Sequence, residues 1–165
     1  NVSSASVSEA SGAVHLKLPA DVEPPVYAEL ASTQLWDLTG CTATVQMTQA
    51  PGSSAYVHFV LLQGTSSIEF YAAKGKLVAQ LGTPSATQTL VSVDYDDDLH
   101  AWWRFREKSG ALLWETSSDG KTWTVLATTG LPFEIASLKI ALGAGTLETM
   151  SAPAEAVFDD FGVGP

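Results

Sequence analysis

The chain has 165 residues, 45% of them hydrophobic, and its 8 basic and 18 acidic residues give a formal charge of −10. This length is typical of one domain with its own core, and the hydrophobic content excludes a disordered tail. The acidic balance argues against nucleic acid or an anionic membrane as partner, because both select clustered lysine and arginine. The single cysteine, Cys41, excludes an internal disulfide and a thiolate zinc site.

Residues 1–12 are rich in serine and alanine and are expected to form a spacer, followed by one domain over residues 13–165. The spacer has neither a basic nor an apolar segment, so no signal peptide is expected in it. No apolar stretch approaches the ~20 residues that a membrane-spanning helix needs. We therefore expect a monomeric module of a larger protein.

Short segments of period-two alternation follow one another along the rest of the chain. They are rich in Val, Thr, Leu and aromatic residues, and turn signals such as Gly143-Ala144-Gly145 separate them. The expected strands are residues 14–18, 26–31, 41–48, 55–62, 67–73, 77–81, 87–94, 99–107, 111–117, 122–127, 138–142 and 156–163. About a dozen short strands in one domain predict an all-β fold, a two-sheet antiparallel β-sandwich of the jelly-roll type.

Residues 99–125 are expected to form a three-stranded meander. Two-residue turns at Ser109-Gly110 and Asp119-Gly120 would place Arg104 opposite Glu115 and Trp114 opposite Val125. The two turns agree on which side chains of the meander lie on each of its two faces. The face expected in the core carries Trp103, Phe105, Leu112, Trp114, Trp123 and Val125. The face expected outside carries Trp102, Arg104, Arg106, Leu113, Glu115, Thr122 and Thr124.

The exposed indole expected at Trp102 is the main candidate for ligand contact. An indole can stack on the apolar face of a pyranose ring, while Arg and Glu beside it bond the sugar hydroxyls. The alternative is that another segment covers Trp102 and that Arg104 and Glu115 form an ordinary cross-strand ion pair. The candidate ligand-binding residues are Trp102, Arg104, Arg106, Glu115, Gln46 and His100. Tyr27, Tyr56 and Tyr71 are further candidate platforms, but the sequence does not decide their orientation.

A spaced set of residues in this region carries a resemblance. It comprises Tyr95-Asp96, His100, Trp102-Trp103-Arg104, Arg106-Glu107, Trp114-Glu115-Thr116-Ser117 and Asp119-Gly120 before Trp123. The set resembles the concanavalin A-like lectin and glucanase jelly-roll modules of secreted bacterial proteins, and residues 157–163 resemble their final strand. The resemblance implies an extracellular or cell-surface location and a neutral polysaccharide or oligosaccharide as partner. It does not identify a ligand, because the superfamily also includes enzymes, adhesins and structural domains.

Catalysis is not expected from the sequence. Glycoside hydrolysis needs two carboxyl groups about 5–10 Å apart, which glucanases of this fold carry in a Glu-x-Asp-x-x-Glu run. Asp94-Tyr95-Asp96 has the first spacing without the glutamate, and His58 lacks the preceding glutamine found in lyases of the fold. Remote carboxylates such as Glu29 and Glu115 could still meet in space. The predicted function is a noncatalytic carbohydrate-binding module, with a structural or adhesive protein-binding sandwich as the alternative and a glycan hydrolase or lyase after it.

No cofactor is required by the sequence, but a structural calcium is considered at two places. Asp94, Asp96 and Asp98 have the spacing of a calcium loop, yet Leu99 stands where such a loop needs glycine, so an acidic solvated loop is expected. The candidate metal ligands are Asp159 and Asp160. The phenylalanines that flank them have opposite parity, which predicts a bulge that turns an aspartate inward. A buried aspartate needs an ion, an arginine or backbone N–H groups, so a hydrogen-bonded or exposed aspartate is the alternative.

Overall fold

The computed structural model describes residues 4–52 and 54–165, and its regular elements are all β-strands. They are β1 (Ser6–Ala10), β2 (Ala13–Leu18), β3 (Val26–Ala31), β4 (Thr42–Gln49), β5 (Tyr56–Gln63), β6 (Ser66–Ala73), β7 (Lys76–Thr83), β8 (Ala86–Asp94), β9 (Trp102–Lys108), β10 (Ala111–Ser117), β11 (Thr124–Gly130), β12 (Lys139–Thr146) and β13 (Ala154–Gly164). No helix of the described ranges has the length and hydropathy of a bilayer span.

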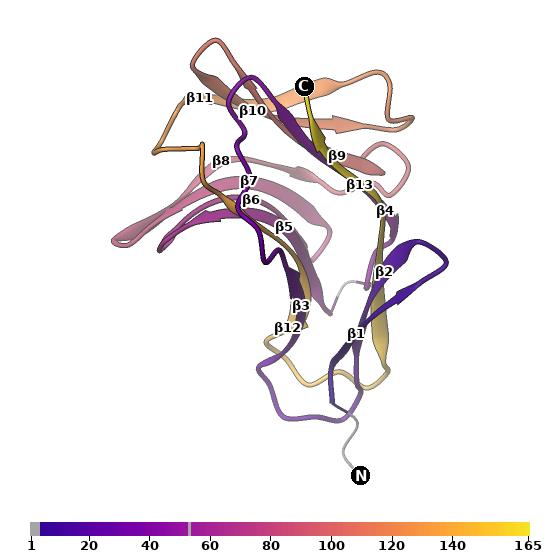
Figure 1. The fold of residues 1–165 in the computed structure, drawn as a ribbon. Coiled ribbons are helices and arrows are strands. Elements are labelled where there is room, and N and C mark those ends of the chain that lie inside the picture. Colours follow the sequence, from indigo (N-terminus) through magenta and orange to yellow (C-terminus); the bar gives the residue numbers. More distant parts are fainter. Residues whose placement is uncertain (1–3, 53) are drawn as a thin grey trace.

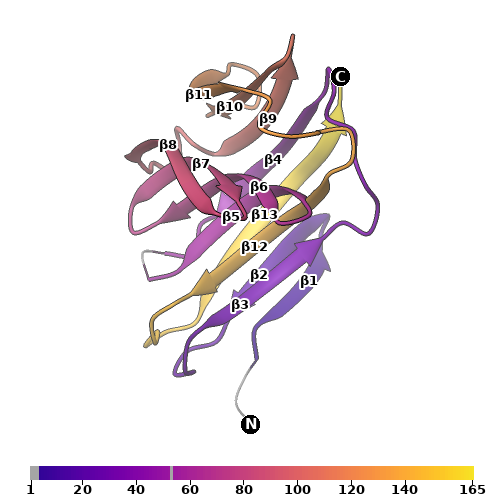
Figure 2. The same ribbon diagram turned by 90° about the vertical axis from the view of Figure 1, so that its left-hand side faces the viewer.

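The strands form two antiparallel sheets packed face to face (Figure 1). One sheet has seven strands in the order β1-β2-β13-β4-β9-β10-β11, and the other has six in the order β3-β12-β5-β6-β7-β8. Figure 2 looks onto the six-stranded sheet, where β12 lies between β3 and β5. The prediction of an all-β, two-sheet jelly roll is confirmed.

Aromatic rings from both sheets meet in the core. The ring centroids of Phe59 and Phe105 are 4.8 Å apart, and Phe70 lies 5.2 Å from Phe105 and 5.6 Å from Trp103. Period-two alternation directs these rings inward and the intervening side chains of β5 and β6 outward. The six-stranded sheet is curved, and its concave face points away from the other sheet (Figure 1).

The first predicted hairpin is confirmed and the second is wrong. In β9 and β10, Phe105 pairs with Trp114 and Arg104 pairs with Glu115. In β10 and β11 Glu115 pairs with Val125, and a bulge between Trp114 and Glu115 makes Trp114 pair with Ala127. The cause is the turn itself, because the Asp119 carboxylate accepts the N–H groups of Lys121 and Thr122 and lengthens the connection.

The longer turn changes which face two residues occupy. Trp123 precedes β11, and its ring lies on the outer face, under the guanidinium of Arg104. Val125 is 46% exposed rather than part of the core. The other four predicted core residues of the meander, Trp103, Phe105, Leu112 and Trp114, are buried.

The expected N-terminal spacer is in part a strand. Ser6–Ala10 forms β1, pairs with β2 at the edge of the seven-stranded sheet, and has five exposed residues. Ser11 and Gly12 both have positive φ. Two such residues form a tight hairpin turn whose twist matches the twist of the strands that it joins. The strand was missed because backbone pairing at an edge leaves no burial pattern in the sequence.

Candidate functional site

Polar side chains from β3, β5, β6 and β7 gather on the concave face of the six-stranded sheet. They alternate with buried residues such as Val57, Phe59, Ile68 and Phe70. Glu29 and His58 both pair with Gly143 of β12, and Glu69 pairs with Gln80. The outward side chains are Tyr27 and Glu29 of β3, Tyr56 and His58 of β5, Glu69 and Tyr71 of β6, and Gln80 of β7.

The imidazole of His58 lies between two carboxylates. Its Nδ1 is 3.0 Å from Oε1 of Glu69, and its Nε2 is 3.5 Å from Oε2 of Glu29. The amide of Gln80 donates to the other oxygen of Glu69 at 2.5 Å. We call Glu29, His58 and Glu69 the central cluster. It connects β3, β5 and β6 across the middle of the concave face.

Two glycines make room for this arrangement. A Cβ at Gly143 would lie 2.1 Å from Nε2 of His58, and one at Gly145 would lie 2.4 Å from the hydroxyl of Tyr56. The two rings of β5 therefore lie over β12. The turn expected at residues 143–145 is wrong, because these residues are inside β12, where the missing side chains allow close approach.

The two carboxylates control the protonation of His58. Burial alone would lower its pKa, but hydrogen bonds to Glu29 and Glu69 outweigh burial and raise the pKa to about 9. The hydrogen bond from His58 lowers the pKa of Glu29 in turn, against the effect of burial. At neutral pH His58 is thus an imidazolium, which can give up one of its two N–H protons.

Tyrosines flank the central cluster. The rings of Tyr56 and Tyr71 lie 5.5 Å apart at 31°, and Tyr27 is 67% exposed. Burial raises the pKa of both Tyr56 and Tyr71, so their hydroxyls stay protonated. The orientation that the sequence left open is therefore outward for all three tyrosines. Such rings offer apolar faces with a polar tip to a ligand on the sheet.

Most of the predicted ligand-binding residues lie together elsewhere, on the outer face of the seven-stranded sheet. Glu115 is buried, with its side chain 2% exposed, and accepts from Nε of Arg104 at 2.8 Å and Nη2 of Arg106 at 2.6 Å. The Arg104 guanidinium also stacks on Trp123 at 3.8 Å. The charged groups of this face are therefore engaged with one another.

Trp102 and Gln46 share that face, since the two residues pair across β9 and β4. Trp102 is half-buried, and its ring lies close to Gly120 of the β10–β11 turn, where a Cβ would be 2.9 Å from the indole. Trp102 thus points outward, as predicted, and one side of it is covered by a turn. Its role as a platform for a sugar ring stays a prediction.

His100 does not join the outer face. It lies in the loop before β9, with its ring stacked on Tyr95 at 5.8 Å, and Tyr95 packs against the buried Trp103. Its Nδ1 accepts the N–H of Asp96, and burial lowers its pKa. Although His100 was predicted as a ligand-binding residue together with Trp102, it is not on the same strand, because β9 begins two residues later, at Trp102.

The predicted bulge in the last strand is confirmed. The pairing of β13 with β4 shifts between Asp159 and Gly162, and Asp160 has a positive φ of 46°. Asp160 is exposed, and its N–H donates to Oδ1 of the half-buried Asp159. Within the described ranges no group of three His, Cys, Asp or Glu residues is placed to hold a metal. Calcium takes 6–8 oxygens, so backbone carbonyls and water would have to supply most of them, and calcium binding there stays a prediction.

Glu69 and Gln80 are the residues that the sequence did not single out. Ser67, Glu69 and Tyr71 alternate with apolar residues, which is the ordinary pattern of a strand with one wet face. Only the pairing of β5, β6 and β7 brings Glu69 to His58 and Gln80. No local spacing carries that information.

Comparison with known proteins supplies the fold family. No protein-family model matches the chain, and no curated protein matches its sequence. Solved structures do match. The Bacillus licheniformis β-glucanase has a TM-score of 0.66 at 14% identity over 93% of this chain and 79% of that one. A prokaryotic β-1,3-1,4-glucanase (lichenase) from a mouse hindgut metagenome has a TM-score of 0.66 at 16% identity over 93% and 80%.

A lectin is also similar. The exoplasmic/lumenal domain of VIP36, in a form bound to Ca²⁺ and Man3GlcNAc, matches with a TM-score of 0.62 at 12% identity over 93% of this chain and 80% of that one.

The prediction that the chain is not an enzyme is contradicted by the comparison with solved structures, because several of the similar structures are named as glucanases or glycosidic hydrolases. Although the chain lacks the Glu-x-Asp-x-x-Glu run, carboxylates from separate strands, Glu29 and Glu69, meet at His58. The chain has the concanavalin A-like jelly-roll fold that these glucanases and this lectin share.

Proposed function

We propose that a glycan chain binds along the concave face of the six-stranded sheet and that the central cluster hydrolyses one of its glycosidic bonds. One observation carries the proposal. Two carboxylates, Glu29 and Glu69, lie on opposite sides of the His58 imidazole at the middle of this face. The names of the similar structures, which include β-glucanases and a lectin bound to Man3GlcNAc, support a glycan as the partner.

The position of His58 decides which groups of the central cluster can face a sugar. Carboxyl pairs of glycosidases lie about 5–10 Å apart on the two sides of the scissile bond. Here the imidazole of His58 fills the space between the carboxylates, with its nitrogens 3.5 and 3.0 Å from their oxygens, so the acid and its partner are His58 and Glu29. The Glu29 side chain is 39% exposed and Glu69 is 14% exposed. Glu29 therefore faces the sugar, while Glu69 and Gln80 hold His58 in position.

The cluster also has the proton that the reaction needs. When the bond between the anomeric carbon and the leaving oxygen breaks, that oxygen takes the proton that His58 holds at neutral pH. A water oxygen then bonds to the anomeric carbon, and a proton of that water returns to the cluster. With His58 neutral, the carboxylate of Glu29 stabilises the positive charge that develops on the sugar ring.

The tyrosines supply binding energy on the same face. Tyr56 and Tyr71 form a tilted pair next to the central cluster, and a cavity of about 170 Å³ lies beside them, lined also by Lys74, Leu147 and Glu148. Sugar rings stack on tyrosine faces through their apolar C–H sides, while hydroxyls and carboxylates bond the sugar edges. A chain of sugars can thus extend from the cluster towards this end of the sheet.

The test is release of reducing ends from glycans of the kinds that the similar proteins' names mention: β-1,3-glucan, mixed β-1,3-1,4-glucan and Man3GlcNAc. We expect hydrolysis of one of them, and a loss of at least about 100-fold in Glu29→Gln, because removal of a catalytic carboxylate costs several kcal/mol of transition-state stabilisation. Glu155→Gln is the matched control, since Glu155 also contacts a histidine, His15, at 2.8 Å on the other sheet.

Two results would contradict the proposal separately. Binding by the wild type without any release of reducing ends contradicts hydrolysis and leaves glycan recognition standing. Equal hydrolysis by Glu29→Gln and wild type contradicts the assignment of the central cluster. An extracellular or cell-surface location is part of the same proposal. A glycan partner of this kind supports that location.

A further inference from the structure

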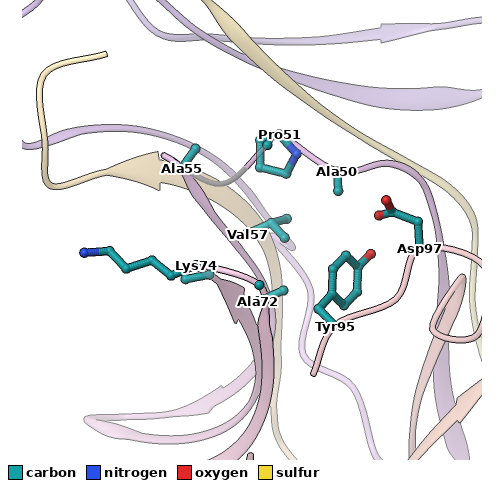
Figure 3. Close-up of a pocket in the computed structure, with 11 residues that line it drawn as sticks. Ala50, Pro51, Ala55, Val57, Ala72, Lys74, Tyr95 and Asp97 are labelled. Atoms are coloured by element: carbon teal, nitrogen blue, oxygen red, sulfur yellow. The ribbon is translucent and has the colours of Figure 1, made fainter. Parts of the chain in front are cut away.

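A second cavity lies at one end of the sandwich and shares no residue with the central cluster. It measures about 250 Å³ (Figure 3). Pro51 from the β4–β5 connection, Val57 of β5 and Ala72 of β6 form apolar parts of its wall, and Tyr95 and Asp97 line it from the loop after β8. Val57 is 1% exposed and Ala72 is 5% exposed, so this part of the wall is a continuation of the core.

The hydroxyl of Tyr95 is buried and lacks a hydrogen-bond partner within the described residues. A buried hydroxyl without a partner is destabilising, and a bound donor or acceptor would recover that loss. Burial and the nearby Asp97 raise the pKa of this hydroxyl, so it stays protonated. Figure 3 shows the hydroxyl and the Asp97 carboxylate on the same side of the cavity.

The neighbouring charged groups are already engaged. Asp94 binds Lys76, and Oδ1 of Asp96 accepts the N–H groups of Asp98 and Leu99. Lys74 binds Glu148, and its ammonium points away from Tyr95 (Figure 3). The carboxylate of Asp97 lies beside the hydroxyl of Tyr95, whose pKa it raises, and forms no ion pair with a described residue. The cavity is therefore apolar with two convergent polar groups, the Tyr95 hydroxyl and a carboxylate without an ion-pair partner among the described residues.

We propose that this cavity binds a small organic cation, a primary ammonium group on an apolar body. The ammonium would pair with Asp97 and donate to the oxygen of Tyr95, and the apolar body would lie against Pro51, Val57 and Ala72. A sugar fits poorly, because its many hydroxyls would meet an apolar wall. The cavity volume of about 250 Å³ suits a small ligand. The formal charge of −10 also attracts cations to the protein.

The test uses cyclohexylammonium as the probe and cyclohexanol as its uncharged counterpart of equal size. Binding is followed by the amide shifts of Ala55, Ala72 and Gly75 in the ¹⁵N-labelled full chain. We expect cyclohexylammonium to shift these amides in a saturable way and to bind at least about tenfold more tightly than cyclohexanol, as an ion pair in a partly dry site would give. Equal binding of the two probes, or no saturable shift, would overturn the proposal.

Two substitutions assign the site. Asp97→Asn should weaken cyclohexylammonium binding at least about tenfold, whereas Asp98→Asn in the same loop should leave it unchanged. Tyr95→Phe should weaken binding by a few fold without lowering the melting temperature, because it removes a hydroxyl that has no partner. Should Tyr95→Phe fail to fold, the comparison of Asp97→Asn with Asp98→Asn decides, since both residues are exposed. Wild-type affinity in Asp97→Asn contradicts the proposed site.

Discussion

The imidazole of His58 occupies the space in which a side chain of Gly143 would begin. A Cβ on Gly143 would lie 2.1 Å from Nε2 of His58, the atom that contacts Glu29. The central cluster therefore depends on a residue that contributes no functional group to it. Gly143 is a positioning residue, and its role can be tested apart from the chemistry.

We predict that Gly143→Ala separates His58 from Glu29. The new methyl group must displace the ring, and overpacking of this kind costs about 1–3 kcal/mol of the free energy of unfolding. Urea unfolding measures the loss. Gly130→Ala is the matched control, because Gly130 is also a strand glycine but has no atom within 4 Å of a Cβ, and it should change stability little. Equal effects of the two substitutions would contradict the steric role of Gly143.

The free energy of unfolding should fall as the pH rises from about 6.5 to 9. His58 has a pKa of about 9 in the folded chain against 6.5 for the ordinary group, so the folded state holds a proton that the unfolded state loses first. The contribution is fully present below pH 6.5 and is lost as the pH rises through 9, with a magnitude of up to about 3 kcal/mol.

Chemical unfolding at a series of pH values measures this effect, with His58→Gln as the comparison. The variant should lack the decline between pH 6.5 and 9, since glutamine does not titrate. If the wild type and His58→Gln follow parallel curves over this range, His58 is not held as an imidazolium between Glu29 and Glu69.

Glu115 should be essential for stability rather than for glycan binding. Its buried carboxylate accepts from both Arg104 and Arg106, and burial opposes its ionisation while the two arginines overcome that effect and lower its pKa. Glu115→Gln should cost about 2–4 kcal/mol, because it leaves two guanidinium groups without their counter-charge. The melting temperature measures the effect, and the exposed Glu9→Gln in β1 is the control. A melting temperature equal to that of Glu9→Gln would show that the arginines do not need this carboxylate.

The sequence predicted the fold well because its signals are local. Period-two alternation marks nearly every strand, and Ser109-Gly110, with φ of 55° and 80°, forms the predicted two-residue turn. The second turn was wrong because side-chain bonds from Asp119 to the backbone lengthen it, which the pair Asp119-Gly120 alone does not indicate. Turn chemistry of that kind decides which face Trp123 occupies.

The candidate site was much less predictable. The outward direction of Trp102 followed from one hairpin, but the central cluster unites Glu29, His58 and Glu69, which come from three strands and span 40 residues of the chain. Their meeting depends on the order β3-β12-β5-β6, which no single strand specifies. Gly143-Ala144-Gly145 lies beside the site, but its two glycines are equally typical of a turn, which is the structure that the sequence predicted there.

The most direct test of the account is to locate the glycan on the protein. The labelled chain is titrated with short β-1,3- and β-1,3-1,4-glucan oligosaccharides while the imidazole signals of His58 and the indole N–H signals of Trp102 and Trp123 are followed. The account predicts saturable shifts at His58, with the two indoles unchanged. Shifts at Trp102 and Trp123 with none at His58 would contradict it and would place the glycan on the outer face of the seven-stranded sheet.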